Sequence, residues 1–242
     1  MKIDLLSVAS VNGMLISARG ASSVRLAEAL AQPPEVAAAR YEIRRRYAAV
    51  MVGTGTVLAD DPTLTSHATA GFTPVRVTLD RRGRIPPGAR FLDGAARTLI
   101  AVCRATPRAY LDLLAARGIE TIDATPASEG AGGGRIDLAR LIAELAARGI
   151  APVVAEGGGT LARGLLQAGL LDRLHLFVMP AVLDAGAVNL FEGGRGTLAR
   201  LELEATGAVG GYALLRYRVG GSTPVEPGAP PATETAPYRG SG

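Results

Sequence analysis

Two glycine-rich stretches hold most of the residues whose types and spacing fit chemistry. The first, VGTGTVLADDPTLT, covers residues 52–65 and places two neighbouring carboxylates, Asp60 and Asp61, ahead of a proline. Because successive side chains of an extended segment point in opposite directions, we expect one acid to face a site and the other to face structure. A strand should end at Gly53, and residues 54–58 should begin a short helix over a phosphate or ribose site. A solvated pair that caps a turn is the alternative interpretation.

The second stretch, VVAEGGGTLARGLLQAGLLDRL, covers residues 153–174 and joins an apolar strand to an acid, three glycines and a helix. Glycines let a ligand approach the backbone, and the free N–H groups at a helix start favour a phosphate. We expect Thr160 to cap this helix and to offer a hydroxyl. Gly157, Gly159 and Ala162 satisfy the dinucleotide pattern G-x-G-x-x-A, whereas no GK[ST] follows, which argues against a nucleotide-hydrolase P-loop. A tight strand-to-helix turn without a ligand would use the same glycines.

Glu156 ends a strand that should be buried, where a carboxylate is costly unless it meets a donor, a cation or a ligand. Two interpretations stay open: it bonds loop amides, or it receives polar N–H groups of a substrate ring. No G-x-S-x-G elbow offers a nucleophile. We expect Cys103 to be an inert buried residue near a strand end, and His175 to be a core histidine.

The composition narrows the classes of partner. The net charge of +4 comes from arginine, since Lys2 is the only lysine, and aromatic residues are only 4% of the chain. A nucleic-acid surface pairs a basic stripe with aromatics, so we expect no nucleic-acid partner. The sequence has no uncharged apolar run of membrane-spanning length, and its start turns polar too early for a signal peptide, so we expect a cytoplasmic protein. One cysteine and two histidines argue against a disulfide framework and a metal site.

Strand and helix patterns alternate along the chain, which predicts a layered α/β domain over residues 1–219. Glycine-rich and proline-rich residues 220–242 are predicted to be a disordered tail. A closing hairpin around Gly210 and Gly211 predicts antiparallel pairing at one edge of a mixed sheet. The predicted strands are residues 3–11, 48–52, 75–79, 98–102, 152–155, 174–178, 201–209 and 212–219, and the predicted helices are residues 34–47, 137–148 and 160–168.

Four stretches together resemble the riboflavin-biosynthesis pyrimidine reductases: SVASVNGMLIS, AVMVGTGTVLADDPTLT, PVRVTLDRRGRIP and VVAEGGGTLARGLLQAGLLDRLHLFVMPAVL. They occur in that family's order and rough spacing over residues 3–219. The resemblance implies a single-domain, dihydrofolate-reductase-like three-layer sandwich with a mostly parallel mixed sheet and an antiparallel C-terminal hairpin. It implies NADPH-dependent reduction of a phosphoribosylamino-pyrimidine to its ribitylamino form, by hydride transfer to C1′ of the ribose. It also implies a homodimer, for which the apolar residues 174–183 are a candidate interface.

The resemblance also carries over site residues by position, and it implies catalysis by positioning, without a nucleophile or a metal. Glu156 would bind the pyrimidine and Arg44 the substrate phosphate, and we hypothesise that Arg81 reads the 2′-phosphate of NADPH. The implied cofactor-binding residues are Thr56, Asp60, Arg81, Gly158, Gly159, Thr160, Leu161 and Gly164. The implied substrate-binding residues are Ser22, Ser23, Arg44, Leu64, His67 and Glu156.

Two departures from the family pattern remove cations near the anionic substrate. Asn12-Gly13-Met14 stands where the family usually has DGK or DGR, and His67 stands where it often has an arginine. A charge-assisted phosphate contact contributes about 1.5–3 kcal/mol, so other cations must compensate or the substrate has changed. Candidate replacements are Arg19, Arg45 and Arg46. The alternatives are therefore the same fold and cofactor with a pterin, dihydrofolate or secondary-metabolite substrate, or a non-catalytic dinucleotide-binding protein.

Overall fold

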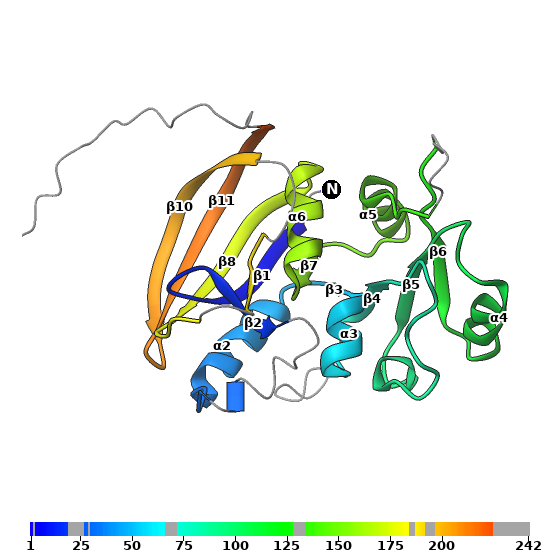
Figure 1. Cartoon of the computed structure of the whole chain (residues 1–242), viewed down its shortest axis with the longest axis horizontal. Coiled ribbons are helices and arrows are strands. Elements are labelled where there is room, and N and C mark those ends of the chain that lie inside the picture. The colour runs from blue at the N-terminus through cyan, green and yellow to red at the C-terminus, as the bar shows by residue number, and fades with distance from the viewer. Residues whose placement is uncertain are drawn as a thin grey trace, which may run out of the picture.

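The computed structural model describes residues 1, 3–18, 27–28, 30–65, 72–127, 134–183, 187–191 and 197–224. The strands are β1 (Ile3–Ser10), β2 (Met14–Ala18), β3 (Ala49–Gly53), β4 (Val75–Leu79), β5 (Thr98–Val102), β6 (Glu120–Asp123), β7 (Val153–Glu156), β8 (Leu171–Met179), β9 (Ala187–Asn189), β10 (Thr197–Val209) and β11 (Tyr212–Pro224). These described strands form one sheet in the order β10-β11-β8-β1-β7-β3-β4-β5-β6, with β2 on β1 and β9 on β2 (Figure 1). The run from β8 to β6 is parallel, and β10 and β11 add antiparallel pairs at one edge, as predicted.

Helices cover both faces of this sheet and make a three-layer sandwich. They are α2 (Pro34–Arg44), α3 (Thr54–Asp60), α4 (Arg108–Ala116), α5 (Leu138–Ala147) and α6 (Gly159–Gln167), with a short 3₁₀ turn, η1 (Arg90–Leu92). In Figure 1, α5 and α6 lie above the sheet, and α2 and α3 lie below it. This arrangement agrees with the predicted dihydrofolate-reductase-like, three-layer α/β architecture.

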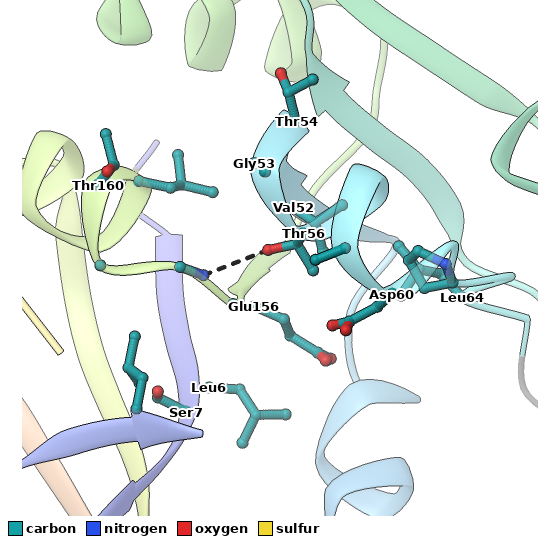
Figure 2. Close-up of a pocket in the computed structure, with 18 of the residues that line it drawn as sticks. Leu6, Ser7, Val52, Gly53, Thr54, Thr56, Asp60, Leu64, Glu156 and Thr160 are labelled. Atoms are coloured by element: carbon teal, nitrogen blue, oxygen red, sulfur yellow. Dashed lines mark hydrogen bonds between the residues drawn. The ribbon is translucent and has the colours of Figure 1, made fainter. Parts of the chain in front are cut away.

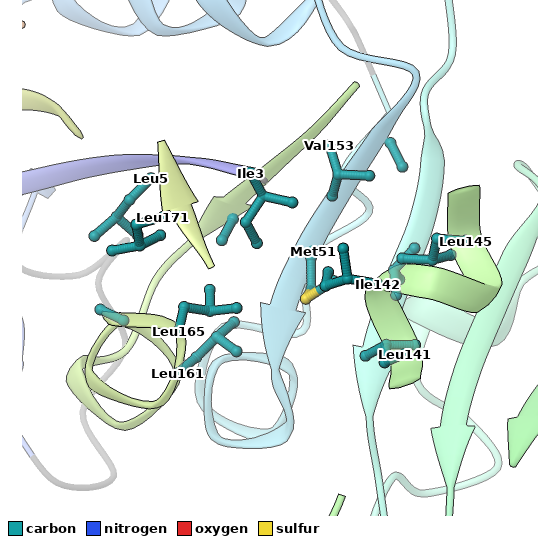
Figure 3. Close-up of a cluster of buried hydrophobic side chains, with 14 of the residues drawn as sticks. Ile3, Leu5, Met51, Leu141, Ile142, Leu145, Val153, Leu161, Leu165 and Leu171 are labelled. Carbon is teal, nitrogen blue, oxygen red and sulfur yellow. The ribbon is translucent and has the colours of Figure 1, made fainter. Parts of the chain in front are cut away.

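Alternating side chains of the central strands enter two hydrophobic cores, one on each face. Ile3 and Leu5 of β1 point toward α5 and α6, whereas Leu6 points to the opposite face. Figure 3 shows the first core, in which Met51 and Leu165 pack among these side chains. Burial of each large aliphatic side chain contributes about 1.5–3 kcal/mol. Since both faces of β1, β3 and β7 are apolar, these strands need helices on both sides, and the parallel centre of the sheet follows.

Local signals in the sequence set several element boundaries as predicted. The predicted strands at 75–79 and 98–102 are β4 and β5. Asp137 is the N-cap of α5, because its carboxylate accepts a hydrogen bond from the N–H of Arg140 at 3.0 Å. Gly210 and Gly211 have φ of +53° and +78°, which suits the two central residues of a tight hairpin turn between β10 and β11.

The C-terminal hairpin is longer than predicted. Strand β11 runs to Pro224 and pairs with β10, so the prediction of a disordered tail from residue 220 was wrong for residues 220–224. Residues 225–242 lie outside the described residues. The sequence GGSTP at residues 220–224 gave no apolar signal, but hydrogen bonding to β10 does not require one.

Five described elements were absent from the prediction: β2, β6, β9, α4 and η1. Strand β6 has four residues, of which only Ile122 is buried, so it carries little periodic signal. Helix α4 buries Tyr110 and Leu114, which are four residues apart, but it is only nine residues long and follows Pro107. Short elements of this kind depend on packing against their neighbours more than on intrinsic propensity.

Residues 174–183 do not offer the exposed apolar interface that was expected. Leu174, Phe177 and Met179 are at most 2% exposed, because they pack in the two cores of the same chain. Only Val182, at 74%, is a strongly exposed large hydrophobic residue in that stretch. In the part of the chain that the structure describes, no helix is long and apolar enough to cross a membrane.

A polar cluster joins β1, β8 and the residues just before β3. The hydroxyl of Tyr47 donates to Asp4 Oδ2 at 2.5 Å and lies 3.1 Å from His175 Nε2. Burial raises the pKa of Asp4, but hydrogen bonds from His175 and Tyr47 outweigh it and leave that pKa lowered. His175 is therefore a paired core histidine, as predicted, and Cys103 is buried near the end of β5, also as predicted.

Candidate active site

A cleft of about 1410 Å³ lies along the carboxyl ends of β1, β3, β4 and β7. Helix α2 and Leu64 form one wall, and the starts of α5 and α6 form the other. Ligands of open α/β sheets bind outside the carboxyl ends of the strands, so this is the expected place for a site.

Pairing of β3 with β7 brings the two glycine-rich stretches into contact. Val52 lies opposite Glu156 in the register, so the turns that follow are neighbours. Gly157 has φ of +90°, and a Cβ there would lie 2.6 Å from Thr56 Oγ1. The N–H of Gly158 donates to the same Thr56 oxygen at 3.5 Å (Figure 2). Only glycine fits at residue 157, and the hydroxyl of Thr56 joins the two turns.

Helix α6 begins at the floor of the cleft with glycines. Its N-cap is Gly158, and no described side chain caps it. The predicted cap by Thr160 was wrong, because the helix starts at Gly159 and the Thr160 hydroxyl therefore belongs to its first turn. Gly158, Gly159 and Thr160 all line the cleft. The first N–H groups and the positive dipole end of α6 are thus available to an anion in the cleft.

The two adjacent acids divide as predicted. Asp60, the last residue of α3, lines the cleft near Leu64 (Figure 2). Asp61 adopts a left-handed backbone with φ of +40°, and its Oδ1 accepts the N–H of Arg90 at 2.8 Å. Asp61 therefore holds the chain that leaves α3, and Asp60 faces the site.

Glu156 forms a buried ion pair in the wall of the cleft. By strand alternation it shares the face of Val154, toward α2. Its two oxygens accept from Nε and Nη2 of Arg44, each at 2.7 Å, and Arg40 Nη2 lies 3.4 Å away. Burial would raise the pKa of Glu156, but the charge and hydrogen bonds of Arg44, and then Arg40, lower it. The carboxylate is therefore ionised, and it meets a cation, which neither interpretation of Glu156 had named.

The opposite wall of the cleft is also basic. Asp80 lies next to Tyr110 of α4, and Arg81 lies next to Gly134, ahead of α5. Asp80 is 1% exposed and accepts the N–H of Ile85 at 2.9 Å. Apart from Arg40 and Arg44, the guanidinium groups that line the cleft belong to Arg81, Arg82, Arg84, Arg90, Arg135 and Arg163. Such a surface suits an anionic small molecule.

A family model described as the RibD C-terminal domain matches residues 3–214, which is most of the chain. The chain belongs to the RibD C-terminal domain family. The predicted membership of the riboflavin pyrimidine reductases is thereby confirmed, and with it an oxidoreductase enzyme.

Two relatives of known name show how much of a RibD-type protein the chain covers. It is 32% identical over 220 residues to a protein of Methanothermobacter thermautotrophicus named 2,5-diamino-6-ribosylamino-4(3H)-pyrimidinone 5′-phosphate reductase. That alignment covers 88% of this chain and 95% of the relative. A riboflavin biosynthesis protein RibD of Chlamydia pneumoniae is 31% identical over 185 residues, which are 74% of this chain and 46% of the relative. The chain thus spans about half the length of that RibD protein.

Solved structures confirm the fold of the RibD C-terminal domain family in this chain. A pyrimidine reductase-like protein from Corynebacterium diphtheriae superposes with a TM-score of 0.68 at 20% identity. The match covers 90% of this chain and 91% of that chain. At this identity the likeness concerns the fold alone.

The described residues of the predicted site gather at one cleft, although their contacts with ligands stay predictions. Ser22, Ser23 and His67 lie outside the described residues. The predicted residues that line the cleft are Thr56, Asp60, Arg81, Gly158, Gly159, Thr160, Leu161, Gly164, Arg44, Leu64 and Glu156.

Asn12 and Met14, two departures from the RibD family pattern, do not belong to the lining of the cleft among the described residues. The amide of Asn12 donates to the carbonyl of Leu183 at 2.6 Å and accepts the N–H of the same residue at 3.2 Å. An aspartate would accept the N–H but would not donate. Asn12 therefore joins the β1–β2 turn to the segment after β8, and its change from the pattern has a structural reason.

Sequence reasoning missed Arg40, Arg135 and Arg163 as residues of the cleft. For Arg40 a signal existed, because it stands four residues before Arg44 and so shares its face of α2. Of the proposed replacement cations, Arg45 pairs with Glu42 on the surface, Arg46 does not line the cleft, and Arg19 lies outside the described residues. Arg40, in contrast, lines the cleft.

Proposed function

We propose that the protein is a cytoplasmic, NADPH-dependent reductase of riboflavin biosynthesis. Its substrate is 5-amino-6-(5-phosphoribosylamino)uracil or the 2,5-diaminopyrimidinone analogue, and its product is the ribitylamino form. Support comes from the family and from a relative that is named a reductase of the diaminopyrimidinone phosphate.

The observation that carries this proposal is the contact between the two glycine turns, where Gly157 leaves no room for a Cβ beside Thr56. That contact leaves a bare backbone surface at the start of α6, next to the acid Asp60 of α3. A dinucleotide needs such a pair of features, namely N–H groups for its diphosphate and an acceptor for ribose hydroxyls.

The residues present therefore fit a nicotinamide dinucleotide. Gly158, Gly159 and Thr160 would hold its diphosphate with backbone N–H groups, and Thr56 and Asp60 would hold a ribose. Arg81 would meet the 2′-phosphate that distinguishes NADPH from NADH. When bound, the reduced nicotinamide supplies the hydride for C1′ of the substrate ribose. The protein's own contribution is to position the reactants and to exclude water.

Substrate binding exchanges the partners of a buried ion pair. Arg44 and Glu156 satisfy each other in the wall of the cleft, and a phosphorylated pyrimidine brings an anion for one and polar N–H groups for the other. Arg40 stands beside them with its side chain 31% exposed, and it adds a second cation for the phosphate. An ionised Glu156 is a hydrogen-bond acceptor only, which matches N–H groups of a pyrimidine ring.

The test is an NADPH-oxidation assay with three substrates side by side: the phosphoribosylaminouracil, the diaminopyrimidinone analogue and dihydrofolate. We expect turnover with at least one of the first two and a product that is heavier by two hydrogens in mass spectrometry. Turnover with dihydrofolate alone would replace the proposed substrate. NADPH binding without consumption of any substrate would identify a non-catalytic dinucleotide-binding protein.

We also propose a homodimer, formed through the β10 edge of the sheet. Leu201 and Leu203 on this strand are 45% and 53% exposed, and a long edge strand with exposed apolar residues favours association. Sedimentation of the wild type and of Leu203→Glu tests this. The proposal predicts a dimer for the first and a monomer for the second, and equal masses would contradict it.

A further inference from the structure

Arg81 and Arg135 bring two exposed guanidinium groups to the same end of the cleft. Arg81 follows β4, and Arg135 precedes α5, so the two come from segments far apart in the chain. In the part of the chain that the structure describes, neither side chain has an ion-pair or hydrogen-bond partner. This contrasts with Arg44, whose charge Glu156 already neutralises.

Gly134 brings the segment that carries Arg135 against the Arg81 side chain. It is buried, its φ is +140°, and a Cβ there would lie 3.3 Å from Nη1 of Arg81 and 3.4 Å from Cβ of Ala105. The residue next to Arg135 is thus packed directly against the Arg81 guanidinium. A Cβ at residue 134 would crowd that guanidinium, so the glycine leaves room for the Arg81 side chain next to the segment that carries Arg135.

The backbone that carries Arg81 is held in place. Thr106 Oγ1 donates to the carbonyl of Arg81 at 3.0 Å, and Asp80 closes the loop on the N–H of Ile85. Gly83, with φ of +63°, packs against the ring of Tyr110, where a Cβ would lie 2.8 Å from Cγ. A held loop loses less conformational freedom when its arginine binds an anion.

We propose that Arg135 joins Arg81 in binding the 2′-phosphate of NADPH, and that Gly134 is the positioning residue that sets their spacing. This inference rests on the proposed function, which puts the diphosphate of the same dinucleotide at the start of α6. A phosphate monoester is close to dianionic at neutral pH, and two planar guanidinium groups match both its charge and its oxygens. NADH lacks this phosphate, so the pair determines the choice between the two cofactors.

The test measures nucleotide binding by calorimetry without any turnover. The probes are adenosine 2′,5′-bisphosphate and adenosine 5′-monophosphate, which differ only in the 2′-phosphate. Arg135→Ala and Arg81→Ala are each expected to weaken the bisphosphate about 10- to 100-fold and the monophosphate far less. Gly134→Val should weaken the bisphosphate selectively, and Arg135→Lys should keep part of the affinity. Arg108→Ala removes the same charge from an 86% exposed side chain on α4 and should change neither probe.

Loss of both probes to the same extent in Arg135→Ala, or loss of neither, would overturn the inference. Because no reaction is measured, this outcome is distinct from failure of the proposed function. A protein that reduces no pyrimidine but prefers the bisphosphate through Arg135 would keep the inference and refute the reaction.

Discussion

The carboxylate of Glu156 and the guanidinium of Arg44 form a two-point ion pair, with both N–O distances at 2.7 Å and both residues at most 7% exposed. The residues that were expected to bind different ends of one substrate are therefore partners of each other. Their pairing keeps two charges ionised inside a largely apolar wall and ready for a ligand that offers the opposite groups.

Glu156→Leu should lower the free energy of unfolding by about 3–5 kcal/mol, because it leaves the Arg44 charge buried without its main partner. The double variant Arg44→Met with Glu156→Leu should recover most of that loss, since it removes both charges. Urea denaturation of the two single variants and the double variant measures the coupling. A double variant that loses the sum of the single losses would show that the pair is not coupled.

The pH dependence of stability should report the same pair. The pKa of Glu156 is lowered from 4.5 in the folded protein, so the unfolded chain binds more protons in the acid range. The stabilisation is fully present above pH 4.5 and is lost as the pH falls through the folded-state pKa. Unfolding free energies of Glu156→Gln should accordingly fall less steeply below pH 4.5 than those of the wild type. Equal slopes would mean that Glu156 titrates alike in both states.

Variants of Asp60 and Asp61 should have different effects: the first on NADPH binding, the second on the free energy of unfolding. Asp60→Asn should raise the KM for NADPH about tenfold, since it weakens a charged acceptor for the cofactor, whereas Asp61→Asn should leave KM unchanged. Asp61→Ala should lower the free energy of unfolding by about 1–2 kcal/mol, because it removes the bond to the Arg90 N–H and keeps a left-handed backbone. The idea fails if the kinetic effect follows Asp61.

Tyr47→Phe should destabilise the protein by about 1–3 kcal/mol without changing NADPH affinity. The hydroxyl of Tyr47 is a donor to the half-buried Asp4, for which His175 at 3.4 Å is the hydrogen-bond partner that remains after the change. Thermal unfolding and a titration with NADPH measure the two effects. Unchanged stability would show that water replaces the hydroxyl.

The sequence predicted features that depend on local pattern and missed those that depend on how distant elements dock. The glycine turns and the Asp137 cap follow from residue types and spacing, and they are present. The prediction that Thr160 caps α6 was wrong, because a small shift in the start of the helix changes which side chain reaches the first N–H groups. The pairing of Glu156 with Arg44 needs both the pleat of β7 and the position of α2, and neither is visible in a single pattern.

The same distinction applies to Asn12, one departure from the family pattern. The motif Asn12-Gly13-Met14 suggested a missing basic side chain at residue 14, near the substrate, but it gave no sign of what Asn12 itself contacts. Its contacts are with Leu183, 171 residues away, and only the fold brings them together. Gly134, the residue before Arg135, likewise packs against Arg81 from a distant part of the chain.

The most direct measurement is the affinity of NADPH for Gly157→Ala, with Gly169→Ala as the control. Both glycines have positive φ, but a Cβ at residue 157 would lie 2.6 Å from Thr56 Oγ1, whereas a Cβ at residue 169 would meet nothing within 4 Å. Backbone strain of about 1–2 kcal/mol is common to both, so only the first should disturb the dinucleotide site. By calorimetry, we expect Gly157→Ala to bind NADPH at least about 100-fold more weakly than wild type and Gly169→Ala to bind it normally. Wild-type affinity in Gly157→Ala would contradict the placement of the dinucleotide on this turn.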